Sequence, residues 1–411
     1  MVVTLIADDL TGACDAGALF AGRGRVGVFV DDRWPSADVA VAVVDTESRG
    51  LEPGAAAERV DATARSLKDR LAHGLVFKKI DSTLRGPVGA ELDALLSATG
   101  HRGALVSPAF PAQKRTVAHG VLLVDGQPAH LSPVGRDPAY PGESSDVVDI
   151  VRRGGATRSV SSLPLARLRG GHAELARALS RASDQIIVAD AETDADLDAL
   201  ARAALDCPQL VLAGSAGLAR AVAEWLGYAG PPAPLPRGRA WLIVGGSLHP
   251  ATRAQLRTLE TAGVASIRLD GPRDPDIRSL IAETEDGRPV VIATRDALAA
   301  ASRAGGETAA RLAHVATRVL AQSRPDLVAV TGGETAIALL RALGAARLDL
   351  LGVPAPGLAL GEVAGSGAPA TPLLTKAGGF GAPDLFLTLL GRASRATSAP
   401  PEVSEWRGTP R

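Results

Sequence analysis

A run of charged and hydroxyl side chains directly follows an apolar segment near residue 80 of this chain. Residues 76–80 (VFKKI) have the composition of a buried strand, and residues 81–85 (DSTLR) come straight after it. In an open α/β sheet, ligands bind at the carboxyl ends of the strands. Cations, a carboxylate and hydroxyls in one small space suit a small anionic ligand that bears hydroxyl groups. We assign Lys79, Asp81, Ser82, Thr83 and Arg85 to this candidate binding cluster.

An alternative is that these residues only start the next helix. Asp81, Ser82 or Thr83 would then cap the helix predicted over residues 88–98, and the charges would be solvated. Capping accounts for one residue, but it explains the whole cluster poorly.

Two further strand ends carry polar groups. Residues 6–21 (IADDLTGACDAGALFA) predict a strand, an acidic turn and a helix capped by Asp9 or Thr11. One cap needs one acid, so either Asp8 or Asp9 is left to bind a hydroxyl, hold a cation or act as a base. Arg49 follows another strand, where it could pair with a ligand carboxylate or form an ordinary surface pair with a nearby glutamate.

Three glycine turns distinguish the second half of the chain. The turns GGSLH (245–249), TGGET (331–335) and KAGGFG (376–381) each lie between a predicted strand and a predicted helix. Glycine turns in this position expose backbone amides to which phosphate groups can bind. We therefore predict a nucleotide or phosphate site here. The chain contains no P-loop motif, and GRGRVG at 22–27 lies between a helix and a strand, the wrong order for a dinucleotide fingerprint.

Short apolar runs alternate with helical patterns, which predicts an α/β fold. We expect two domains, each a mainly parallel sheet flanked by helices, with the ligand cleft between them. Residues 107–120 are expected to form a loop, and residues 120–129 an antiparallel hairpin arm. The strands expected in the first half are 2–7, 26–30, 39–44, 75–80, 103–108, 185–190 and the run that starts at 210, and helices are expected at 54–72 and 88–98.

The length of 411 residues exceeds what one core usually serves, and a proline-rich segment marks the boundary. We predict an N-terminal domain over 1–226, a linker over 227–239, a C-terminal domain over 240–392 and a flexible tail over 393–411.

Composition excludes several classes of function. A formal net charge of −1 and 3% aromatic residues argue against nucleic-acid binding. No apolar run is long enough to cross a membrane or to form a signal peptide, and two distant cysteines fit a reducing compartment. We expect a cytoplasmic protein with a small-molecule ligand, no nucleic-acid or membrane partner, no resident metal site and a homodimer as the default assembly.

Six motifs occur in the order IADDLTGA, KKIDSTLRG, SPAFPAQKRTV, GGSLHP, TGGETA and KAGGFG. Together they resemble the four-carbon acid sugar kinase family, which includes D-threonate, D-erythronate and 3-oxotetronate kinases. The resemblance spans Ile6 to about Leu390. It implies an acid-sugar-binding N-terminal domain, an ATP-binding C-terminal domain and transfer of the ATP γ-phosphoryl group to the terminal 4-hydroxyl of a four-carbon sugar acid.

Carried over by motif, the resemblance implies a substrate site at Asp8, Arg49 and residues 79–82. Arg49 and Lys79 would anchor the carboxylate, and Asp81 or Asp8 would accept the hydroxyl proton. Mg²⁺ would accompany the ATP phosphates. The implied nucleotide contacts are Ser247, Gly332, Gly333, Glu334, Thr335, Gly378 and Gly379.

Two other functions fit a two-domain α/β protein that closes on a small acid. One is an NAD(P)-dependent dehydrogenase of a small hydroxy acid, although the dinucleotide fingerprint is missing. The other is a non-catalytic sensor of a small acid or a nucleotide. Ligand-dependent consumption of ATP separates the kinase from both.

Overall fold

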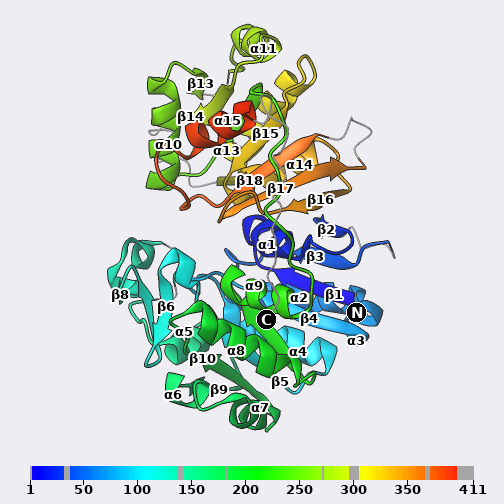
Figure 1. The fold of residues 1–411 in the computed structure, drawn as a ribbon, viewed down its shortest axis with the longest axis vertical. Helices are drawn as coiled ribbons and strands as arrows, with labels where there is room; N and C mark the ends of the chain where they lie inside the picture. The colour runs from blue at the N-terminus through cyan, green and yellow to red at the C-terminus, as the bar shows by residue number, and fades with distance from the viewer. Residues whose placement is uncertain are drawn as a thin grey trace, which may run out of the picture.

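The computed structural model describes residues 2–31, 38–137, 140, 142–181, 183–270, 273–295, 305–365 and 371–395. Within these ranges, one 15-stranded sheet runs through both halves of the chain, with helices packed along it (Figure 1). Its strand order is β13-β14-β12-β15-β18-β17-β16-β2-β3-β1-β4-β11-β5-β10-β9.

The N-terminal half contributes eight strands, and each pairs with its neighbours in this half in parallel. Most of these strands are near-continuous apolar runs, because helices cover both faces of the sheet. The strands are β1 (Val2–Ala7), β2 (Val26–Phe29), β3 (Val41–Asp45), β4 (Gly74–Lys79), β5 (Gly103–Ser107), β9 (Ser159–Leu163), β10 (Gln185–Ala189) and β11 (Leu210–Gly214). The helices are α1 (Leu10–Gly17), α2 (Pro53–Ser66), α3 (Lys68–Ala72), α4 (Val88–Thr99), α5 (Val147–Arg153), α6 (Leu165–Leu168), α7 (His172–Ser180), α8 (Asp194–Leu205) and α9 (Ala216–Trp225).

A small antiparallel sheet projects from this half, coloured cyan in Figure 1. It consists of β6 (Arg115–Ala118), β7 (Val121–Val124) and β8 (Gln127–Pro128). The hairpin arm predicted around residue 125 is therefore confirmed. The loop predicted over 107–120 is wrong in its second part, where the apolar and β-branched residues of β6 pair with β7.

Across the sheet, the C-terminal half has five parallel strands in the order β13-β14-β12-β15-β18. Two antiparallel strands, β17 and β16, lie between these five and the N-terminal half. The strands are β12 (Trp241–Gly245), β13 (Ala265–Leu269), β14 (Val290–Thr294), β15 (Leu327–Thr331), β16 (Arg347–Gly352), β17 (Leu358–Ala364) and β18 (Pro372–Lys376). The helices are α10 (Pro250–Thr261), α11 (Arg278–Glu285), α13 (Gly305–Leu320), α14 (Gly333–Ala342) and α15 (Leu385–Arg395).

The two halves share both a strand pair and a core. Strand β16 pairs with β2 in antiparallel fashion, with Leu348 opposite Val28. Helix α1 lies at this junction, where a Cβ placed on Gly17 would be only 2.8 Å from side-chain carbons of both Leu350 and Val43. The small residues of α1 thus allow the two halves to approach, and one cluster of buried apolar side chains extends through both.

The α/β class, the two mainly parallel sheet regions and the flanking helices are confirmed. Residues 227–240 form neither helix nor strand and run from one half to the other, in green in Figure 1. The helix predicted over 54–72 is divided into α2 and α3 at Leu67. Of the predicted tail, residues 396–411 lie outside the described residues.

None of the helices in the described ranges is both long enough and apolar enough to cross a membrane. Over the same ranges, no group of three or more histidine, cysteine or acidic residues could hold a metal ion.

Candidate active site

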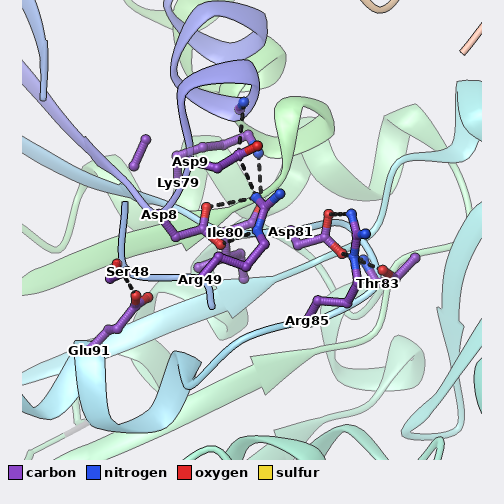
Figure 2. Close-up of polar contacts among 12 residues, drawn as sticks. Asp8, Asp9, Ser48, Arg49, Lys79, Ile80, Asp81, Thr83, Arg85 and Glu91 are labelled. Carbon is purple, nitrogen blue, oxygen red and sulfur yellow. Dashed lines mark hydrogen bonds and ion pairs between the residues drawn. The ribbon is translucent and has the colours of Figure 1, made fainter. Parts of the chain in front are cut away.

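Three neighbouring strands bring the predicted acid-binding residues to one edge of the sheet. Strand β1 lies between β3 and β4, and Ala7 is opposite both Asp45 and Lys79. The residues that follow these three strand ends therefore lie side by side. Figure 2 shows that the side chains of Asp8, Asp9, Arg49 and Lys79 converge there.

Arg49 and Asp8 form a buried bidentate ion pair. The Arg49 Nε and Nη2 atoms donate to the two Asp8 oxygens at 2.8 and 2.9 Å, and the Asp8 side chain is 1% exposed. Burial alone would raise the pKa of Asp8, but the nearby positive charges of Arg49 and Lys78 hold it below its usual value. Asp8 is therefore ionised, and both of its oxygens bind Arg49. Arg49 does not form the alternative surface ion pair with a nearby glutamate.

Asp9 caps helix α1. Its Oδ1 accepts hydrogen bonds from the backbone N–H of Gly12 at 2.9 Å and from Arg49 Nη2 at 2.6 Å. Of the two caps that the sequence allowed, the structure thus has Asp9 rather than Thr11. Arg49 holds both acids of the turn in place.

Lys79 reaches the same space from β4. Its Nζ donates to the carbonyl of Ile80 at 2.8 Å, and the Ile80 side chain is fully buried. A Cβ on Gly12 would lie 3.0 Å from Lys79 Nζ and 2.6 Å from Asp9 Oδ1. The absence of a side chain at Gly12 therefore allows the charged groups to gather beside α1.

Asp81 is occupied by its own neighbours. It accepts from the backbone N–H and the hydroxyl of Thr83, and from Arg85 Nε and Nη2, both at 2.9 Å. Arg85 also donates to Asp137 at 2.8 Å. Although burial would raise the pKa of Asp81, Arg85 and then Arg49 hold it well below its usual value. Asp81 thus fixes this turn, while the half-buried Ser82 hydroxyl has no hydrogen-bond partner within the described residues.

A second buried ion pair lies behind this cluster, and the sequence reasoning missed it. Lys78 Nζ is 2.9 Å from Glu91 Oε2, with side chains 0% and 1% exposed, and the Ser48 hydroxyl donates to Glu91 Oε1 (Figure 2). The sequence did contain a signal for this pair: Lys78 lies at a buried position of a predicted strand, and Glu91 lies at a buried position of a predicted helix. Because these side chains are not accessible, we assign them to support of the Arg49 segment.

The glycine turns of the C-terminal half also meet at neighbouring strand ends. Strand β15 lies between β12 and β18, and Thr331 is opposite both Gly245 and Lys376. The turns touch one another so closely that a Cβ on Gly378 would collide with the Ser247 hydroxyl. The predicted nucleotide contacts are therefore brought together.

The remaining predicted nucleotide contacts surround this point. A Cβ on Gly332 would lie 3.2 Å from Ser247 N, and one on Gly379 would lie 3.1 Å from His249 Nε2. Thr335 is buried in the first turn of α14, whereas Glu334 is exposed and has no polar partner within the described residues. The turns thus present backbone and small side chains rather than charged groups.

Lys376 is the buried cation of this half. It is 1% exposed, and its Nζ donates to the carbonyls of Ala377, Gly378 and Phe380 at 2.8, 3.2 and 2.9 Å. Burial lowers its pKa to about 7. It supports the glycine turn through these hydrogen bonds, and an anionic ligand would favour its charged form.

The two clusters face each other across the junction of the halves. A Cβ on Gly333, the first residue of α14, would lie 3.0 Å from Thr11 Oγ1 and 3.3 Å from Asp9 Oδ2. Nearby, the Arg115 guanidinium lies over the Phe380 ring, 5.9 Å from its centroid. The charged cluster and the glycine turns therefore form one site.

His249 shows that the surroundings of the site are positively charged. Its pKa is lowered first by burial and then by the charges of Lys376, Arg85 and Arg115, which come from both halves. The sequence placed His249 in a predicted glycine turn and Arg115 in a predicted loop but named neither as a ligand contact, because neither the Arg115–Phe380 contact nor the approach of the halves has a local signal. This concentration of cations suits a polyphosphate.

A cavity of about 670 Å³ lies elsewhere, lined mainly by residues 229–234 and 351–356 together with Gly22 and Arg392. None of the predicted site residues lines it. We therefore base the site on the converging charged and glycine groups rather than on cavity size.

Known protein families match both halves of the chain. A family described as a sugar-binding N-terminal domain matches residues 3–222, and one described as a nucleotide-binding C-terminal domain matches residues 242–386. The chain thus combines a match to a sugar-binding domain family with a match to a nucleotide-binding domain family.

Relatives that align over nearly the whole chain identify its family more specifically. The chain is 36% identical to a D-threonate kinase of Cupriavidus necator, covering 92% of this chain and 94% of that one. It is 32% identical both to a D-threonate kinase of Salmonella typhimurium (93% and 96% covered) and to a D-erythronate kinase of Heliobacterium modesticaldum (94% and 95%). The chain therefore belongs to the four-carbon acid sugar kinase family, as its motifs predicted.

Solved structures confirm the fold. A Salmonella typhimurium protein aligns with a TM-score of 0.76 at 23% identity, covering 96% of this chain and 99% of that one. A Haemophilus influenzae protein aligns with a TM-score of 0.71 at 22% identity, covering 95% and 99%. At these identities the likeness concerns the fold alone.

Proposed function

We propose that this protein is an ATP-dependent kinase that phosphorylates the terminal 4-hydroxyl of a four-carbon sugar acid. The observation that carries the proposal is the approach of Gly333 to Thr11 and Asp9, because it joins the charged cluster and the glycine turns into one site. Phosphoryl transfer requires positioning and charge neutralisation above all, and these two clusters are suited to supply them.

In this proposal the half formed by residues 1–226 binds the sugar acid. Arg49 and Lys79 attract the carboxylate, and Arg49 is held rigidly by its bidentate bonds to Asp8. The hydroxyls of Ser82 and Thr83 contact the substrate hydroxyls. Asp81 and Arg85 hold this turn in shape through their own ion pair.

The half formed by residues 240–392 binds ATP. The turn at residues 332–335 and the turn at Gly378 and Gly379 cradle the phosphates through backbone amides, beside Ser247. Arg115 and Lys376 add positive charge near these turns. The positive charges of Arg115 and Lys376 attract the γ-phosphoryl group toward the acid-binding cluster.

Mg²⁺ bound with nucleotides keeps several waters and uses one or two carboxylates together with phosphate oxygens. The carboxylate of Glu334, in the first turn of α14, is exposed and has no polar partner in the part of the chain that the structure describes, so it fits this requirement. The ion would neutralise phosphate charge there.

The proposal is tested by measuring ADP release with ATP, Mg²⁺ and a panel of four-carbon acids that includes D-threonate, D-erythronate and 3-oxotetronate. We expect ADP only when all three components are present, and phosphorus NMR should place the new phosphate on the terminal oxygen. Three- and five-carbon acids serve as length controls. Tight NAD(P) binding without ATP binding, measured by calorimetry, would contradict the proposal in favour of a dehydrogenase. Binding of an acid or a nucleotide without turnover would favour a sensor.

A further inference from the structure

The carboxylates around the proposed site differ in how many of their oxygens are free. Both oxygens of Asp8 accept from Arg49, and both oxygens of Asp81 accept from Arg85. Protonating either carboxylate would break a charge-assisted bidentate pair. Neither is well arranged to take a proton from a substrate.

Asp9 is held differently, by one oxygen only. Its Oδ1 accepts from Arg49 Nη2 and from Gly12 N, while its Oδ2 makes no hydrogen bond within the described residues. Its side chain is 22% exposed, whereas that of Asp8 is 1% exposed. Asp9 is therefore an oriented carboxylate with one accessible oxygen.

That free oxygen lies where the two halves of the site meet. Asp9 Oδ2 is 3.3 Å from the position of a Cβ on Gly333, which opens the glycine turn of the other half. On its other side, Asp9 shares Arg49 with Asp8 and so adjoins the acid-binding cluster (Figure 2). An acceptor hydroxyl poised between a bound sugar acid and a bound γ-phosphoryl group must occupy this region.

We propose that Asp9 is the catalytic base, an inference that rests on the proposed function. The acceptor hydroxyl oxygen forms a bond to the γ-phosphorus of ATP as the bond from that phosphorus to the β,γ-bridging oxygen breaks. The bridging electron pair leaves with ADP, and the hydroxyl proton passes to Asp9 Oδ2. Arg49 keeps Oδ1 in place throughout, so the carboxylate needs no rearrangement to receive the proton.

The test is Asp9→Asn in the full-length protein, because asparagine can still accept from Gly12 N and caps helices well. We expect kcat, and the single-turnover rate, to fall by about 10²- to 10⁴-fold. The dissociation constants for ATP and for the sugar acid, and the melting temperature, should be unchanged. Asp61→Asn, which alters a partly exposed aspartate paired with Arg65 on α2, is the matched control and should keep full activity.

Three outcomes would overturn the inference. A kcat for Asp9→Asn within a few-fold of the parent would show that another group takes the proton. Recovery of kcat at high Mg²⁺ would show that Asp9 is a metal ligand instead. A loss confined to KM for the acid would make it a positioning residue. Failure of the parent protein itself to form ADP with any four-carbon acid would instead remove the proposed function on which the inference rests.

Discussion

The two halves of the site are built from different material. The N-terminal half uses charged side chains that largely neutralise one another, such as Arg49 with Asp8 and Lys78 with Glu91. The C-terminal half uses glycine turns around Ser247 and a buried lysine that has no acidic partner within the described residues. In the proposed function, a fixed set of ion pairs is suited to select the shape and hydroxyl pattern of a small acid, whereas exposed backbone is suited to a phosphate chain.

This contrast also determines how each half tolerates change. Removing one member of a buried ion pair leaves an uncompensated charge. Such a substitution in the N-terminal half should therefore affect stability as well as ligand binding. Adding atoms to a glycine turn fills space that a ligand needs. Such a substitution in the C-terminal half should therefore affect only the neighbourhood of that turn. Substitutions in the two halves should therefore affect different ligands.

Among the substitutions that compare the two halves, the largest effect is expected for Arg49→Ala. Losing a charge-assisted hydrogen bond to the substrate carboxylate costs about 1.5–3 kcal/mol, or about a 10- to 150-fold fall in kcat/KM. Because Asp8 is then left buried without its partner, the midpoint of urea unfolding should fall as well. Steady-state kinetics and unfolding curves measure both effects.

Arg65→Ala provides the control for Arg49→Ala, because Arg65 also pairs with an aspartate but is 73% exposed. Kinetics and stability of this control should match those of the parent. If Arg49→Ala weakened ATP binding and left the affinity for the acid intact, the division of roles between the halves would be wrong.

A smaller effect is expected for Gly378→Ala. The new methyl group would collide with the Ser247 hydroxyl, and such overpacking costs about 1–2 kcal/mol where a side chain can move aside. We expect the dissociation constant for ATP to rise about 5- to 30-fold, with no change in the affinity for the sugar acid. Calorimetric titration with each ligand separates the two.

Gly306→Ala, in α13 of the same half, is the matched control for Gly378→Ala. A Cβ there meets nothing within 4 Å, so the substitution should leave ATP binding intact. Equal ATP affinity of Gly378→Ala and the parent would show that the turn at 378 does not touch the nucleotide.

Most of the parallel strands could be predicted from the sequence, because strands buried on both faces are continuous apolar runs. Strand β9 (SVSSL) was missed, since three of its five residues are exposed serines. Strand β16 was missed because its buried leucines alternate with partly buried charged residues beside the turn that leads to β17. Its pairing with β2 joins segments more than 300 residues apart, which no local pattern reveals.

The same distinction holds for the site. Asp8, Arg49 and Lys79 could be predicted as a cluster, because each lies at or just after the carboxyl end of a strand and these ends meet at one edge of a parallel sheet. The free oxygen of Asp9 could not, because it depends on which acid Arg49 binds through both oxygens and on how closely Gly333 approaches from the other half. Side-chain pairing and the placement of the halves are properties of the folded chain.

The smallest effect concerns the lysine that the C-terminal half leaves without a counter-charge. Burial lowers the pKa of Lys376 to about 7 from an ordinary value of 10.5, so its amine is mostly neutral at pH 8 in the free protein. Bound phosphates favour the charged form and raise that pKa again, so ATP binding at pH 8 should take up a proton, approaching about one per site. At pH 6 the lysine is already charged, and the uptake should vanish.

Calorimetry in buffers of different ionisation enthalpy measures this uptake, and Lys376→Met should abolish it at pH 8. His249, whose pKa lies below its ordinary value of 6.5, is neutral in the free protein at pH 8, and His249→Asn tests whether it contributes. If the heat of ATP binding at pH 8 does not depend on the buffer, protonation of Lys376 is not coupled to ATP binding. The difference between the halves would then consist of the glycine turns alone.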